Sequence, residues 1–127
     1  MPFSLQSLII VYVAFATKQL VCDFLLQTSW MAKGKCRQSG WVRPLLAHAG
    51  THAMGTLLIC LAAAPALFWL AIVDFVVHAG IDRTKALATE RMAINEPRFW
   101  WALGTDQMAH QLTHFTYVLA LLTAVPA

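Results

Sequence analysis

The sequence predicts an all-α protein: a four-helix transmembrane bundle with an interfacial segment between helices three and four. Hydrophobic residues make up 59% of the chain and charged residues 12%, whereas soluble domains average roughly 45–50% and about 25%. Residues 1–17, 44–73 and 107–127 contain no Asp, Glu, Lys or Arg, and each stretch approaches or exceeds the ~18 apolar residues of a bilayer span. Because 127 residues suffice for one domain only, we expect residues 1–127 to form a single integral membrane domain.

Four helices are expected, over residues 3–27, 44–64, 66–85 and 99–123. The first is interpreted as a retained helix, because no basic residue precedes its apolar run as in a signal peptide. Pro44 suits the first turn of the second helix, and Pro65 a break before the third. Segment 86–98 mixes charged and apolar residues, and we expect Pro97 to stop regular structure, so this segment is placed along the membrane interface.

The basic residues predict the orientation of the bundle. Eight of the nine Lys and Arg lie between residues 33 and 43 or between 83 and 98, and the ninth is Lys18 in the first helix. By the positive-inside rule both loops are cytoplasmic and both termini lie outside. Basic residues beside membrane spans favour lipids as partners over nucleic acid, which is not expected. The sequence leaves a homo-oligomer open, and the three cysteines, which form no Cys-x-x-Cys pair, are interpreted as reduced and structural.

Every helix carries polar residues spaced four apart, which places them on one helical face. Ionisable groups that faced lipid would each cost a few kcal/mol, on the order of 3, so these faces are expected to meet inside the bundle. The stripes are Gln19, Asp23 and Gln27; His48 and His52; Asp74, His78 and Asp82; and Asp106, His110 and His114.

Several of these side chains fall at one depth, roughly 6–12 Å from the predicted cytoplasmic helix ends, with Asp82 nearer the surface and His110 deeper. Imidazoles and carboxylates that converge in a bundle core are typical of transition-metal sites. We expect zinc, with manganese or iron as alternatives, because most candidate ligands are nitrogen. Asp23 and Asp82 are the candidate catalytic carboxylates, orienting a water or acting as base. The candidate metal ligands are His48, His52, His78, Asp106 and His110.

Other polar residues have structural or binding interpretations. Lys18 and Asp74 lie at similar depth near mid-bilayer and are predicted to form an ion pair, whereas His114 is the deepest His and has no partner expected at its level. Arg83 and Lys85 follow Asp82 at the membrane surface, where they either bind a phosphate or only determine topology. The candidate substrate-binding residues are Gln27, Arg83, Lys85 and Gln107.

Four ordered motifs also carry a family resemblance: Asp23-Phe24-Leu25-Leu26-Gln27, His48-x3-His52, His78-x2-Ile81-Asp82-x2-Lys85 and Asp106-Gln107-x2-His110. In that order they resemble small bacterial integral-membrane proteins of domain-of-unknown-function family 3307. The resemblance implies a bacterial inner-membrane location but no reaction. Members usually carry a His where this chain has Gln19.

Three functions are consistent with these features. The leading hypothesis is a membrane-embedded metal-dependent hydrolase that opens to the cytoplasm and cleaves a phosphoester in a lipid or other amphiphile. The second is a small transporter or ion-relay protein, in which the stripes conduct protons or a metal ion. The third is a non-catalytic membrane partner or effector, whose polar core only fixes the packing of the helices.

Overall fold

The computed structural model describes residues 4–124, and within them the all-α prediction is confirmed: there are five α-helices and no strand. The chain order is α1 (Leu5–Leu20), a π-helical turn η1 (Val21–Leu25), α2 (Ser29–Gly34), α3 (Val42–Ala63), a 3-10 turn η2 (Pro65–Leu67), α4 (Leu70–Thr89) and α5 (Pro97–Ala124). Ser4 begins α1 by accepting a hydrogen bond from the N–H of Ser7 at 3.0 Å, as an N-cap residue does.

Two of the sequence predictions need correction. Segment 86–98 is not an interfacial stretch throughout, because α4 continues to Thr89 and α5 already begins at Pro97. Proline is tolerated in the first turn of a helix, where its missing N–H would have no intrahelical partner, so Pro97 starts regular structure here. The short helix α2 was not expected. Thr28 caps it by accepting from the N–H of Met31 at 3.2 Å.

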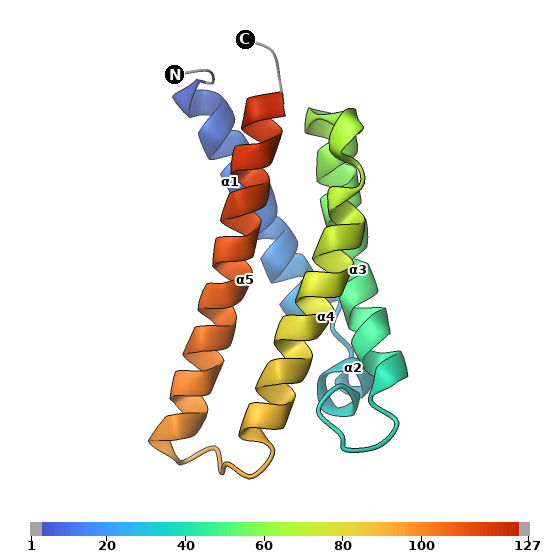
Figure 1. Ribbon diagram of the computed structural model, residues 1–127, viewed down its shortest axis with the longest axis vertical. Coiled ribbons are helices and arrows are strands. Elements are labelled where there is room, and N and C mark those ends of the chain that lie inside the picture. The colour runs from blue at the N-terminus through green and yellow to red at the C-terminus, as the bar shows by residue number, and fades with distance from the viewer. Residues whose placement is uncertain (1–3, 125–127) are drawn as a thin grey trace.

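The long helices lie side by side (Figure 1). The beginning of α1, the end of α5 and the α3–α4 turn at η2 lie at one end, and α2 and the α4–α5 connection lie at the other. Apolar side chains fill the first end, where Phe15, Cys60, Leu70, Val118 and Leu121 belong to one buried cluster. The polar stripes therefore occupy the bundle between this apolar plug and α2.

Close approach fixes α2 against the start of α3. A Cβ atom added to Gly34 would lie 2.4 Å from Cγ of Pro44, so only glycine fits at this contact without a shift of one helix. Gly34 is the last residue of α2, and the next residue, Lys35, is buried. This contact brings a basic residue of the first loop into the bundle.

The outer surface is strongly apolar. Leu5, Phe24, Leu58, Val76 and Trp101 are each more than 60% exposed. Six Asp and His residues of the bundle interior are less than 5% exposed: His48, His52, Asp74, His78, Asp82 and His110. A soluble domain buries mainly apolar side chains and exposes most of its charged ones. Along the long helices apolar groups thus face outward, whereas the ionisable groups of the polar stripes face inward.

Length and composition allow two described helical segments to cross a membrane, Leu5–Leu25 and Val42–Ala63. Core helices of soluble proteins and signal sequences can share these properties. Neither α4 nor α5 is among these candidates; α4 carries Asp74, Asp82, Arg83 and Lys85. The part of the bundle prediction that these data support is therefore an all-α fold with two helices suited to a membrane.

Candidate metal centre

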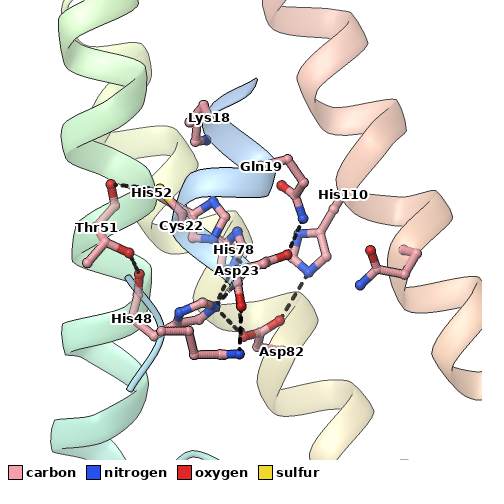
Figure 2. Close-up of polar contacts among 12 residues, drawn as sticks. Lys18, Gln19, Cys22, Asp23, His48, Thr51, His52, His78, Asp82 and His110 are labelled. Atoms are coloured by element: carbon pink, nitrogen blue, oxygen red, sulfur yellow. Dashed lines mark hydrogen bonds and ion pairs between the residues drawn. The ribbon is translucent and has the colours of Figure 1, made fainter. Parts of the chain in front are cut away.

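Four imidazoles and two carboxylates from four segments of the chain point toward one another (Figure 2). His48 and His52 come from α3, His78 and Asp82 from α4, and His110 from α5. The ring centroids of His52 and His78 are 3.7 Å apart, and those of His78 and His110 are 4.2 Å apart. The sequence prediction that these stripes meet is confirmed by these contacts.

Asp23 reaches the imidazoles from the π-helical turn η1. The turn closes with a hydrogen bond from the N–H of Leu26 to the carbonyl of Val21 at 2.8 Å, one residue wider than in an α-helix. Single π turns inside helices are frequent at functional sites. Oδ1 of Asp23 lies 2.9 Å from Nε2 of His52 and 3.3 Å from Nε2 of His48, and Oδ2 accepts from the Gln19 amide.

Asp82 is the second carboxylate of the cluster, and it is paired with Lys35. The sequence predicts Lys35 only as a basic residue of the first loop. Lys35 Nζ lies 2.6 Å from Oδ2 of Asp82, while Oδ1 lies 3.0 Å from Nε2 of His110. The sequence gives no periodic signal for Lys35, since it follows a six-residue helix outside the long stripes.

Two groups of side chains have the spacing of metal ligands. In the first, ligand atoms of Asp23, His48, His52 and His78 all lie within 4.8 Å of one another, and in the second those of His78, Asp82 and His110 do. Nε2 of His78 is 3.3 Å from Nε2 of His48. Ligands bound tetrahedrally at about 2.0–2.1 Å from zinc are separated by about 3.3 Å, which matches the 3.3 Å from Nε2 of His48 to Nε2 of His78 and to Oδ1 of Asp23.

The first group also has unsatisfied polar atoms. Nδ1 of His48, His52 and His78 is buried and has no hydrogen-bond partner among the described residues. Nε2 of His48 and Nε2 of His52 are directed at Oδ1 of Asp23, and Nε2 of His78 is directed at Nε2 of His48, so these three nitrogens are positioned to share one cation. The donor set, three nitrogens and one carboxylate oxygen, fits zinc better than magnesium or calcium.

The remaining candidate residues surround the cluster. Asp106 belongs to neither ligand group, but its Oδ1 lies 3.5 Å from Nε2 of His110 and its Oδ2 lies 3.9 Å from Lys85 Nζ. Gln27 donates to the backbone carbonyl of Asp23 at 3.0 Å, and Gln107 donates to its neighbour Asp106 at 3.1 Å.

Arg83 does not join the cluster. Its guanidinium lies 4.0 Å from the ring centroid of Trp41 and donates to the carbonyl of Arg37 at 3.1 Å. It lines a separate cavity of about 310 Å³ together with Arg37 and Glu90. The Arg83 guanidinium thus holds the first loop through Arg37 and Trp41, and it forms no ion pair with the Asp82 carboxylate.

A second polar cluster lies farther from α2, and here the predicted Lys18–Asp74 ion pair is confirmed at 2.6 Å. Lys18 also donates to Thr56 at 2.9 Å and lies 3.0 Å from Nε2 of His114, so its three ammonium protons face three acceptors. The expectation that His114 has no partner at its level is wrong. A Cβ on Gly55 would lie 2.7 Å from Cγ of Lys18, so this glycine makes room for the lysine stem.

The imidazoles of the first cluster, around His78, lie deeper in the bundle than the sequence predicts. Counted from the ends of α3, α4 and α5 nearest α2, the imidazoles lie roughly 9–20 Å along the helices, from the helical rise of about 1.5 Å per residue. The difference arises because α4 ends later, and α5 begins earlier, than expected. Lys35 on the α2 side closes the cluster from that end.

These features define the class of protein: an all-α bundle with an apolar exterior and a buried His/Asp cluster that is able to hold a metal ion. Comparison with family models assigns the chain more specifically. It belongs to the family described as "Protein of unknown function (DUF3307)", whose model matches residues 9–126. This confirms the family resemblance. Searches of curated proteins and of solved structures each found no significant match.

Proposed function

We propose that this protein is a membrane-embedded, metal-dependent hydrolase whose His/Asp cluster binds zinc and acts on a phosphoester of a lipid or other amphiphile. The observation that carries the proposal is the spacing of His48, His52, His78 and Asp23, whose ligand atoms lie within 4.8 Å of one another. Four separate segments of chain contribute to the wider cluster. Helix packing alone does not require side chains from four separate segments to lie at the distances of metal ligands.

The apolar exterior supports a membrane location. Burying ionisable groups inside while exposing Leu, Phe and Trp lowers the free energy only where the surroundings are hydrocarbon. We propose that α1, α3, α4 and α5 all span a bacterial inner membrane, with α4 and α5 hiding their polar stripes against α1 and α3. We further propose that the α2 end lies in the cytoplasm and both termini outside, which the positive-inside rule supports because the basic residues gather at the α2 end.

Each polar residue of the cluster then has a proposed role. His48, His52 and His78 hold the ion. Asp23 lies within ligand distance of them, but we assign it as the candidate general base and not as a permanent fourth ligand, because its side chain is 15% exposed while His48 and His52 are fully buried. A catalytic zinc with three protein ligands and an open position lowers the pKa of water to about 7. Asp82 is paired with Lys35 at 2.6 Å, and this ion pair holds both side chains at the α2 side of the cluster.

An ion-relay function is the second candidate, and the Lys18 cluster favours it. Together with Gln19 and Asp23, this cluster extends the polar interior from the imidazoles to Asp74 and His114. The polar groups end there, because Phe15 and Tyr117 pack against His114 with ring centroids 5.4 and 6.2 Å away. A conducting path would have to open this apolar plug, which makes the hydrolase the stronger proposal.

Metal analysis of the purified protein tests the proposal. We expect about one zinc per chain from the single complete ligand set, and loss of that zinc in His52→Gln. His114→Gln is the matched control, since His114 is a buried imidazole outside both ligand groups and its loss leaves the zinc in place. Equal zinc content in both variants, or none in the wild type, would overturn the proposal. Zinc binding without phosphoesterase activity would instead favour the ion-relay candidate.

A further inference from the structure

A groove runs between α4 and α5 and is lined almost entirely by small or apolar side chains. Its volume is about 500 Å³, within the roughly 300–1,000 Å³ of small-molecule sites. Alanines and glycine keep it open: a Cβ on Gly80 would meet no atom within 4 Å. The residues that define its length are Val77, Gly80, Ile81, Ala88, Ala102 and Ala109.

The groove has one charged position, formed by Lys85 and Asp106. Lys85 Nζ lies 3.9 Å from Oδ2 of Asp106, beyond hydrogen-bond distance, and donates no hydrogen bond to any residue between 4 and 124. Its side chain is 21% exposed. An ammonium with free donors in an apolar groove is suited to bind an anionic oxygen.

The groove borders the His/Asp cluster through one shared wall residue, Asp106. Asp106, which lines it, lies 3.5 Å from Nε2 of His110, and the His110 ring lies against the His78 ring at 4.2 Å between centroids. A head group held at Lys85 would therefore lie next to the cluster, while an attached alkyl chain followed the small residues toward the outside of the bundle.

We propose that the α4–α5 groove binds a membrane phospholipid, with one alkyl chain along the small residues and an exposed phosphate at Lys85. This inference rests on the proposed function and names the substrate class of the same site. Apolar lining stabilises the chain by about 0.8 kcal/mol per buried methylene, and the ammonium supplies preference for an anionic head group. Phosphate is the head group because the adjacent cluster is proposed to cleave its ester.

Spin-label spectroscopy tests the groove directly. The protein is reconstituted into phosphatidylcholine nanodiscs that contain a trace of chain-labelled phosphatidic acid, whose phosphate is exposed, or of chain-labelled phosphatidylcholine. We expect an immobilised component with phosphatidic acid that is several-fold larger than with phosphatidylcholine. Equal components for the two lipids would overturn the assignment of the phosphate to Lys85.

Two variants locate the bound lipid. Gly80→Leu fills the groove and abolishes the immobilised component, whereas Gly104→Leu is the matched control. Gly104 is an exposed helical glycine with no atom within 4 Å of an added Cβ, and it does not line the groove. An undiminished component in Gly80→Leu would refute the site. Lys85→Gln lowers the preference for phosphatidic acid roughly fivefold and decides the matter if Gly80→Leu does not fold.

The metal content is measured on the same samples, so that failure of the groove and failure of the metal centre can be told apart. With chelator present, lipid immobilisation persists because neither Gly80 nor Lys85 is a proposed ligand. Immobilisation that requires zinc would contradict a preformed groove, while zinc binding with no selective immobilisation would overturn only the lipid assignment.

Discussion

Replacing Lys18 by Met is expected to destabilise the protein more than any exposed charge substitution. The ammonium and Asp74 are 2.6 Å apart, and both side chains are at most 3% exposed. At an effective dielectric constant of about 20 their attraction is roughly 6 kcal/mol, most of which offsets desolvation. Removal of one partner leaves an unpaired buried carboxylate, which costs about 3–5 kcal/mol of the free energy of unfolding.

The measurement is the free energy of unfolding by denaturing detergent in mixed micelles, followed by circular dichroism. Lys33→Met is the control, because Lys33 is exposed and its substitution stays within about 0.5 kcal/mol. The double variant Lys18→Met/Asp74→Leu recovers much of the loss, which gives a coupling energy of at least about 2 kcal/mol. A single-variant cost below about 1 kcal/mol, or additive effects in the double variant, would refute a buried ion pair.

Three further predictions concern α2, the metal and the α4–α5 connection. Gly34→Ala pushes α2 from Pro44 and lowers the free energy of unfolding by about 1–3 kcal/mol, measured in the same detergent titration. Zinc at about 100 times its dissociation constant stabilises the wild type by about 2.7 kcal/mol but not His52→Gln, and chelator reverses the gain. The Ala93 N–H and Arg98 hold the Glu96 pKa below its usual 4.5. These contacts to the Glu96 carboxylate therefore stabilise the fold above pH 4.5, and their contribution is lost as the pH falls through the lowered pKa. NMR titration measures the Glu96 midpoint, which Arg98→Gln moves upward.

The helical spacing of polar residues was sufficient to predict which side chains meet. Four-residue intervals place His48 with His52 and His78 with Asp82 on single faces, and hydrocarbon or any apolar surrounding drives such faces together. The same argument predicted the Lys18–Asp74 pair, because both lie at one depth. Periodicity and the cost of an unpaired charge thus contain most of the information about the interior.

The features that were missed depend on local backbone geometry. A π turn at Val21–Leu25 adds one residue to the helical repeat, and no composition signal marks it. Lys35 enters the bundle only because Gly34 lets α2 approach Pro44, so its role depends on a steric contact between helices and not on a stripe. Pro97 was assigned to a break because both a helix start and a helix stop tolerate proline.

The two buried clusters have different chemistry because their charges are balanced differently. Around Lys18 the ammonium faces one carboxylate, one hydroxyl and one imidazole nitrogen, so its donors are matched by acceptors without any added ion. Around His78, among residues 4–124, two carboxylates and four imidazoles face a single ammonium, that of Lys35, which contacts Asp82. The Lys18 cluster is therefore complete as packed, and the His78 cluster is the one that a divalent cation would stabilise.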